Sequence, residues 1–164
     1  MKNPEPAELL KIHRLLKESL IIPDLQAGER ESALEEMIRS LHGHDKRLSA
    51  KEIYDKLLQR EKLGSTAVGN GYAIPHGKVK GLEEPLILLA VSRTGVSFEA
   101  VDGKPAHVFF LVLSSAENPS LNLQLLAAVA HFIRRSRPLL KRICKARTSR
   151  EILDLIRDEE EKLI

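Results

Sequence analysis

The residues best suited to chemistry in this 164-residue sequence lie in a short segment that ends at His76. An imidazole can attack a phosphoryl group with one ring nitrogen while a hydrogen bond holds the other nitrogen and fixes the tautomer. Neutral imidazole is the attacking form, and the product is a covalent phosphohistidine. Pro75 fixes the backbone just before the histidine, and Gly77 follows it. The sequence therefore predicts a nucleophilic histidine on a rigid turn.

The segment before His76 is rich in glycine and in small polar residues, a composition that suits an anion cradle. The phosphorylated ring would need backbone N–H groups, hydroxyls, a helix N-terminus or an arginine beside it. The candidates for these phosphate-binding contacts are Arg60, Ser65, Thr66 and Asn70. The residues alone leave a second interpretation open, in which His76 is a turn histidine bonded to the backbone.

A nucleotide-binding P-loop is another interpretation of a glycine-rich segment, and the spacing excludes it. That motif reads Gly-x-x-x-x-Gly-Lys-Ser/Thr. Here Gly71 and Gly77 enclose five residues, and Lys78 is followed by Val79. Pro75 would also remove one of the N–H groups that cradle phosphate. We therefore expect no Walker-type ATP site.

We expect no metal site, no disulfide framework and no cofactor. Cys144 is the only cysteine, so a disulfide within one molecule is excluded. His42 and His44 lie close together, but two histidines without further ligands are more typical of a polar helix end.

Several helices that could position the site are indicated by apolar spacing and by capping residues. Ser49 and Glu52 form a capping box, and Gly64 follows the helix that they begin. A second box, Thr148 with Glu151, begins the last helix. Further helices are expected at about 30–41 and 121–135, and a short helix followed by an extended piece is expected before Pro23.

Two continuous apolar runs, 86–91 and 107–113, predict interior strands covered on both faces. Residues 96–101 predict a third strand, with a turn after it. Helices that flank central strands indicate a layered α/β domain. The length and the 43% hydrophobic content favour one domain over 1–164 with a single core.

The charge distribution is uneven, although the net charge is only +3. Residues 134–150 carry eight arginines and lysines and no acidic residue. With 4% aromatic residues and no known reading motif, we expect no nucleic-acid binding there, and predict a solvated face or a patch for an acidic protein partner. No run approaches the roughly 20 apolar residues of a membrane span, and the N-terminus lacks the apolar core of a secretion signal. We therefore expect a cytoplasmic protein without membrane insertion.

The pattern around His76 resembles a known family. Arg60-Glu61, Gly64-Ser65-Thr66, Gly69-Asn70-Gly71 and Ala73-Ile74-Pro75-His76-Gly77 are similar to the active-site signature of the fructose/mannitol-type enzyme IIA domains of the bacterial sugar phosphotransferase system, which include the nitrogen-regulatory enzyme IIA proteins. The resemblance covers about residues 50–135. It implies a three-layer α/β/α sandwich with a central mixed β-sheet.

The resemblance also implies a mechanism and its partners. His76 would accept the phosphoryl group from a small histidine phosphocarrier protein, and Arg60 matches the arginine near the family's site. The group would then pass to an enzyme IIB domain or serve as a regulatory mark read by a target protein. The protein would thus be a phosphotransferase component, and we favour the nitrogen-regulatory subtype.

The sequence departs from the family pattern at one position. A second histidine usually lies on the helix after the last core strand, and Asn122 takes that place here. An amide can donate a hydrogen bond to a phosphate oxygen but cannot carry a proton as imidazole does. The alternative function is therefore a binding regulator that has the enzyme IIA fold but has lost onward transfer. His131, nine residues along the helix, should point away from Asn122.

Overall fold

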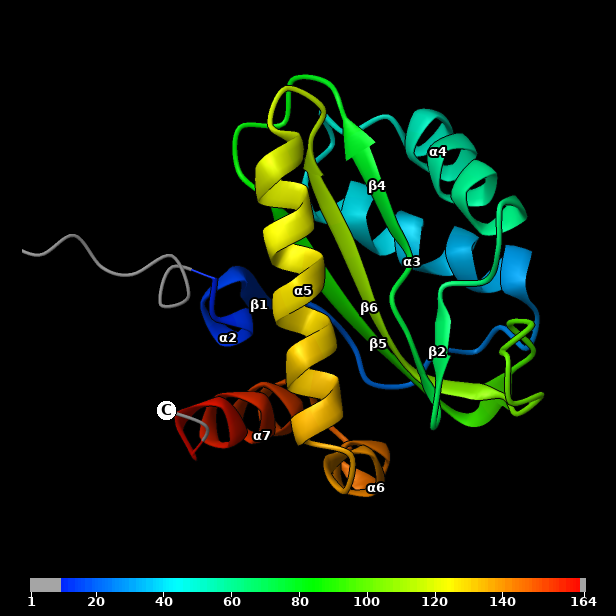
Figure 1. Cartoon of the computed structure of the whole chain (residues 1–164), viewed down its shortest axis with the longest axis vertical. Coiled ribbons are helices and arrows are strands. Elements are labelled where there is room, and N and C mark those ends of the chain that lie inside the picture. The colour runs from blue at the N-terminus through cyan, green and yellow to red at the C-terminus, as the bar shows by residue number, and fades with distance from the viewer. Residues whose placement is uncertain (1–9, 163–164) are drawn as a thin grey trace, which may run out of the picture.

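The computed structural model describes residues 10–162, which are built around a six-stranded sheet (Figure 1). The strand order is β1-β5-β6-β3-β2, and β4 pairs with β6 beyond the end of β3. Antiparallel pairing joins β5 to β6 and β2 to β3, whereas β1–β5, β3–β6 and β4–β6 are parallel, so the sheet is mixed. The strands are β1 (Leu16–Ile22), β2 (Ala67–Gly69), β3 (Tyr72–Ala73), β4 (His76–Val79), β5 (Leu86–Val96) and β6 (Ala106–Ser115).

Helices cover both faces of the sheet, which confirms the predicted three-layer α/β/α sandwich. Helices α3 and α4 pack on one face, and α2, α5, α6 and α7 pack on the other. Their bounds are α2 (Ile12–Leu15), α3 (Arg30–His44), α4 (Ala50–Lys62), α5 (Pro119–Arg135), α6 (Leu139–Lys145) and α7 (Ser149–Lys162). Within residues 10–162, no helix combines the length and the hydropathy that a membrane span needs.

The position of β6 in the interior of the sheet explains why its sequence is continuously apolar. Its side chains alternate between the two faces, so Phe109 packs in the core with α3 and α4 while Phe110 packs in the core with α5. Phe110 contacts Tyr72 and Phe132, with ring centroids 6.3 and 6.1 Å away. Residues on both faces of β5 and β6 are buried over these stretches, which confirms the prediction of interior strands at 86–91 and 107–113.

Side-chain caps are present at the helix starts, including the two predicted at Ser49 and Thr148. The Ser49 hydroxyl accepts a hydrogen bond from the backbone N–H of Glu52, and the Asn118 side chain accepts one from Leu121. The Thr148 hydroxyl accepts one from Glu151 in the same way. Such caps satisfy N–H groups that have no partner within the helix.

Five expectations need correction. The buried residues form two hydrophobic cores, one on each face of the sheet, where a single core was expected. Residues 96–101 do not form a strand of their own, because β5 continues to Val96 and only Ser97 makes a single bridge, to Glu29. Helix α3 runs past Gly43 to His44. The segment before His76 contains the short strands β2 and β3, and His76 itself begins a strand where a turn was expected. Helix α6, after Pro138, was not predicted.

Candidate active site

His76 is the first residue of β4 and lies in register with Val112 of β6. Strands β3 and β4 pair with successive parts of β6, and the interruption between them falls at Ile74 and Pro75. Proline has no N–H to donate to a ladder, which explains the interruption. The backbone groups at the interruption still form hydrogen bonds. The N–H of Ile74 donates to the Thr66 carbonyl, and the Pro75 carbonyl accepts from the N–H of Val112. Pro75 thus places His76 where pairing resumes.

The imidazole of His76 is partly buried and is held at both nitrogens. Its Nδ1 lies 2.9 Å from the carbonyl oxygen of Ile74, and its Nε2 lies 3.3 Å from Nε of Arg60. A carbonyl oxygen only accepts and a guanidinium N–H only donates. Nδ1 therefore carries the proton, and the lone pair that could act as a nucleophile is on Nε2.

The environment keeps this ring neutral. Burial lowers the pKa of His76 below its ordinary value of 6.5, and the positive charge of Arg60 lowers it further, whereas the hydrogen bond to the Ile74 carbonyl acts in the opposite direction. A neutral imidazole retains the nucleophilic lone pair at neutral pH. Both the tautomer and the protonation state therefore suit attack by Nε2.

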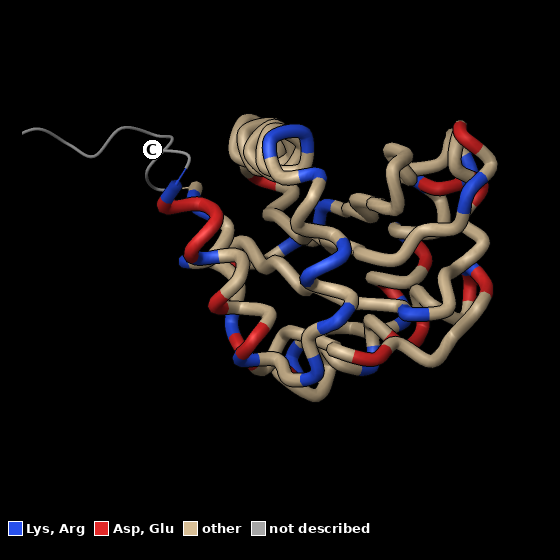
Figure 2. Tube along the Cα trace, turned by 90° about the horizontal axis from the view of Figure 1, so that it is seen from below, with Lys and Arg blue, Asp and Glu red and all other residues tan. Residues whose placement is uncertain are grey.

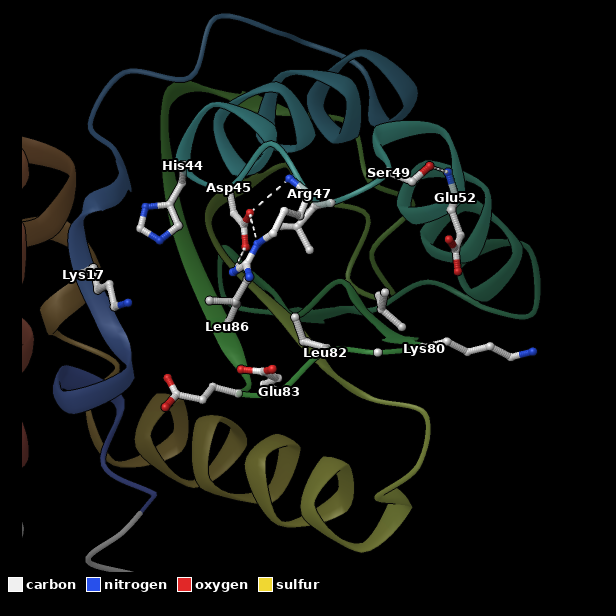
Figure 3. Close-up of a pocket in the computed structure, with 14 residues that line it drawn as sticks. Lys17, His44, Asp45, Arg47, Ser49, Glu52, Lys80, Leu82, Glu83 and Leu86 are labelled. Carbon is white, nitrogen blue, oxygen red and sulfur yellow. Dashed lines mark hydrogen bonds and ion pairs between the residues drawn. The ribbon is translucent and has the colours of Figure 1, made fainter.

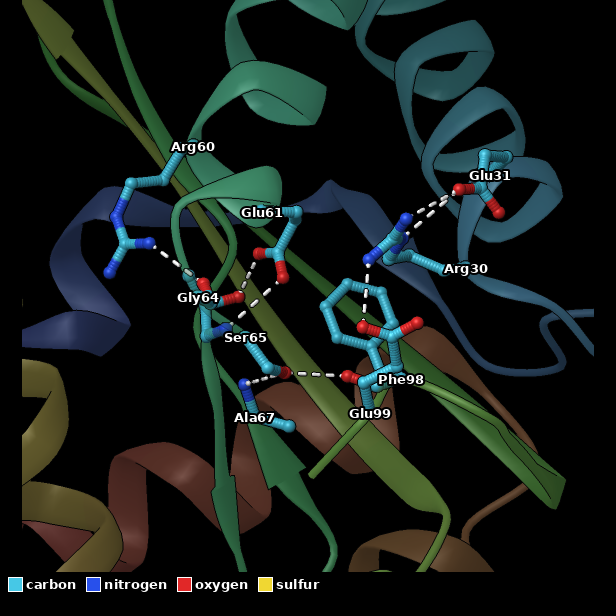
Figure 4. Close-up of polar contacts among 10 residues, drawn as sticks. Arg30, Glu31, Arg60, Glu61, Gly64, Ser65, Ala67, Phe98 and Glu99 are labelled. Carbon is cyan, nitrogen blue, oxygen red and sulfur yellow. Dashed lines mark hydrogen bonds and ion pairs between the residues drawn. The ribbon is translucent and has the colours of Figure 1, made fainter. Parts of the chain in front are cut away.

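Arg60 reaches the histidine from the last turn of α4. Its Nη1 donates to the carbonyl oxygen of Gly64, 2.9 Å away, just beyond the end of that helix (Figure 4). Helix α4 packs closely on β4, since a Cβ at Gly77 would lie 3.5 Å from the Leu57 side chain. The guanidinium is thus anchored by one nitrogen while another faces His76.

A buried carboxylate fixes the loop that anchors Arg60. Glu61 is only 2% exposed, and its two carboxylate oxygens accept hydrogen bonds from the backbone N–H and the hydroxyl of Thr66 (Figure 4). Burial raises the pKa of Glu61, although these hydrogen bonds and nearby arginines act against the rise. In the sequence, Glu61 stands only as part of the Arg60-Glu61 motif, with no predicted role. A signal was present, because an acidic residue in the last turn of a helix is unfavourable unless it has a specific partner.

Three predicted phosphate-binding residues make other contacts. The hydroxyl of Ser65 donates to the carbonyl of Phe98 and accepts from the N–H of Ala67. The hydroxyl of Thr66 is bound to Glu61. Asn70 lies in the β2–β3 turn, where its N–H donates to Asp102.

Asn70 is also remote from the histidine along the sheet. The turn that contains it pairs with β6 at Val108, four residues from Val112, which is about 13 Å along a strand. The glycine-rich segment is therefore a hairpin followed by an anchored strand, and the structure brings Arg60 to His76 but does not bring Asn70 there.

Asn122 lies on α5, over the face of the sheet that carries Val112. It is 5% exposed, and its carboxamide oxygen accepts a hydrogen bond of 2.7 Å from the Ser114 hydroxyl. Ser114 is paired with Lys78, two residues along β4 from His76. Among residues 10–162 the amide NH₂ group of Asn122 has no hydrogen-bond partner, so it can still donate.

Other histidines make structural contacts or point outward. His107 binds the Ser92 carbonyl, His42 the Leu48 carbonyl and His44 the Ser19 hydroxyl, each through Nδ1. His131 is exposed on α5, whereas Asn122 is buried on the same helix, as its spacing predicted.

A hollow of about 470 Å³ opens between the α3–α4 turn and the β4–β5 loop (Figure 3). Exposed side chains of both charges line it, including Lys17, Arg47 and Glu83. Asp45 and Arg47 pair with each other at its edge. It lies beyond the end of β4 that is opposite His76, so it is separate from the site described above.

The fold agrees with comparisons to known proteins. Residues 14–159 match the family model described as "Phosphoenolpyruvate-dependent sugar phosphotransferase system, EIIA 2". The chain therefore belongs to the EIIA 2 family of the phosphotransferase system.

Within that family, the relatives include regulators and sugar-specific components. The chain is 33% identical over 150 residues to a nitrogen regulatory protein of Bradyrhizobium diazoefficiens, covering 90% of this chain and 95% of that protein. It is 30% identical over 147 residues to the fructose-specific EIIABC component of Bacillus subtilis. This match covers 90% of this chain but only 23% of that longer protein. The structure superimposes on nitrogen regulatory protein IIA-Ntr of Neisseria meningitidis with a TM-score of 0.79 and 28% identity, covering 88% and 98% of the two chains.

Proposed function

We propose that this protein carries a phosphoryl group on Nε2 of His76. The observation that supports this most directly is the pair of hydrogen bonds to the ring: the Ile74 carbonyl holds Nδ1–H, and Arg60 faces Nε2. A nucleophile oriented by one partner and faced by a cationic donor is the arrangement that phosphoryl transfer requires.

The transfer step follows from this geometry. The lone pair of Nε2 forms a bond to phosphorus while the phosphorus–nitrogen bond of the donor phosphohistidine breaks. The ring becomes cationic, and the Ile74 carbonyl stabilises it by keeping the Nδ1–H. Arg60 must release the Nε2 lone pair as the phosphoryl group arrives, and its N–H groups can then bind the phosphoryl oxygens.

A radiolabel experiment tests the proposal. The protein is incubated with labelled phosphoenolpyruvate, enzyme I and a histidine phosphocarrier protein, the donor that the family implies. We expect acid-labile label that is lost in His76→Ala and retained in the exposed-histidine control His131→Ala. No label, or equal label in His76→Ala, would refute the proposal.

We further propose the nitrogen-regulatory subtype. Its support is the similarity to nitrogen regulatory proteins, 33% identical over 150 residues for that of Bradyrhizobium diazoefficiens and 28% identical with a TM-score of 0.79 for that of Neisseria meningitidis. The phosphorylated and unphosphorylated forms would then differ in their binding to a target protein. An enzyme IIB domain remains the acceptor to test, because a solved complex joins the mannitol IIA and phosphorylated IIB enzymes of Escherichia coli, whose IIA shares this fold at 18% identity and a TM-score of 0.71.

A second candidate function is regulation without onward transfer, and Asn122 favours it. Its amide can bind a phosphate oxygen but cannot exchange a proton with the leaving group. Transfer from phosphorylated protein to an enzyme IIB domain would be compared between the natural protein and Asn122→His. Slow transfer that the histidine accelerates supports the regulator, whereas fast transfer by the natural protein contradicts it.

A further inference from the structure

A dense positive surface lies at the end of the molecule formed by α6 and the C-terminal end of α5. We call it the basic end, and it consists of Arg93, Arg134, Arg135, Arg137, Lys141, Arg142, Lys145 and Arg147, all of them exposed. Arg93 joins it from the sheet, because its Nη2 donates to the carbonyl of Ala146, 3.1 Å away. Figure 2 shows basic segments at the end of α5 and along the chain that continues from it.

These charges are not neutralised within the molecule. Among residues 10–162, none of the eight side chains forms an ion pair, whereas neighbouring Arg150 pairs with Glu18 and Asp154. Basic residues in the last turn of a helix interact favourably with its C-terminus. This explains the positions of Arg134 and Arg135 in α5 and of Arg142 and Lys145 in α6. It does not account for the remaining four, of which Lys141 lies in the first half of α6.

The basic end is remote from the candidate active site. His76 pairs with Val112, which pairs with Ile87 of β5, and Arg93 lies six residues further along that strand. Six residues of strand span about 20 Å. A partner on the basic end could therefore bind while His76 is engaged with another protein.

Acidic residues beside the basic end indicate what kind of anionic partner can bind there. A cleft of about 430 Å³ separates α6 from α7, with Arg142 and Lys145 on one wall and Glu151 and Asp158 on the other. Asp158 pairs with Arg157, whereas Glu151 forms no ion pair among residues 10–162. The apolar side chains of Ala146 and Leu155 also line it. A uniformly anionic partner would meet the α7 carboxylates and be repelled, whereas a protein surface can present charges of both signs.

Nucleic acid and membrane are less suitable partners for two further reasons. The 134–150 segment contains no aromatic residue on which bases could stack. A helix that lies in a membrane surface presents apolar side chains beside its cations, but the exposed large hydrophobic residues of the described chain lie elsewhere, at Leu63, Val68, Val101 and Leu123.

We propose that the basic end is a docking surface for an acidic segment of a partner protein, with carboxylates against α6 and at least one cation against α7. This surface acts separately from His76.

The probes are two synthetic peptides, both rich in glutamate, one of which also carries a single terminal lysine. Binding of each peptide to the full chain is followed through backbone amide chemical shifts in α6 and α7. A DNA duplex and vesicles containing phosphatidylserine are tested separately for comparison. We expect both peptides to bind, the lysine-bearing one more tightly, and the affinity to fall about tenfold in the double variant R142E/K145E. The matched control R39E/K46E makes the same charge change on exposed residues elsewhere and should alter the affinity less than about twofold.

His76→Ala should bind the peptides as the natural protein does, so this test is independent of phosphoryl transfer. Tighter binding of DNA or vesicles than of the peptides would overturn the proposal, as would no peptide binding or an equal loss in both double variants.

Discussion

At the scale of single residues, the nitrogen that would attack phosphorus already accepts a hydrogen bond from Arg60. The same cation therefore has two opposed effects. It occupies the Nε2 lone pair before transfer, and it can stabilise the anionic phosphoryl group afterwards. The anchor to Gly64 matters because it lets the guanidinium turn toward the phosphoryl oxygens without leaving the site.

Replacing Arg60 by alanine tests both effects. The repulsion between Arg60 and a protonated ring would disappear, so the pKa of His76 should rise from its lowered value toward 6.5. The neutral fraction in mildly acidic solution then falls, and the pH profile of phosphorylation moves to higher pH. We expect the rate at neutral pH to fall about a hundredfold. Arg60→Lys should keep the pKa low but recover only part of the rate. An unchanged pKa in an NMR titration of Arg60→Ala would contradict this account.

Glu61 positions the site indirectly, by holding Thr66 and thereby the loop that anchors Arg60. Glu61→Ala would leave the buried N–H and hydroxyl of Thr66 without partners, and we expect a loss of about 2 kcal/mol in the free energy of unfolding. Glu61→Gln can still accept from the N–H and donate to the hydroxyl, so its loss should stay below about 1 kcal/mol. Urea unfolding measures both. Equal losses in the two variants would show that hydrogen bonding to Thr66 is not what matters.

At the scale of elements, the β2–β3 hairpin contains three successive residues with positive φ, of which the last two form its turn. Asn70 has φ 56° and Gly71 has φ 86°, the backbone form of a tight two-residue hairpin turn. A Cβ at Gly71 would lie only 2.8 Å from a methyl carbon of Leu140, so the turn also packs directly against α6. The glycine is therefore needed for conformation and for space.

We expect Gly71→Ala to destabilise the protein by about 1–3 kcal/mol, because it combines backbone strain with this close contact. Asn70→Gly is the matched control, since glycine adopts positive φ freely and Asn70 is exposed. Thermal unfolding of both variants would distinguish them. A Gly71→Ala protein as stable as Asn70→Gly would mean that the turn changes shape easily.

At the scale of the whole molecule, one sheet supports two hydrophobic cores, and β6 contributes to both. Damage to one core should therefore weaken the entire fold. Phe110 is fully buried between Tyr72 and Phe132, and we expect Phe110→Ala to cost about 3–5 kcal/mol in the free energy of unfolding. Leu123, which is 69% exposed, is the control, and its replacement by alanine should change stability by less than about 0.5 kcal/mol. Separate unfolding transitions for the two helical layers would contradict the shared-core account.

The sequence by itself determined the features that depend on neighbouring residues. Capping at Ser49 and Thr148, the apolar runs of β5 and β6 and the Pro75-His76 pattern are local, and each predicted its element or its family correctly. Local propensity cannot show which of several donors faces an imidazole, because that depends on strand register and on contacts between distant segments. The family resemblance had placed Arg60 near the site, but only the tertiary structure decided that its Nε faces Nε2 of His76, that Thr66 binds a buried carboxylate and that Asn70 lies further along β6, away from His76.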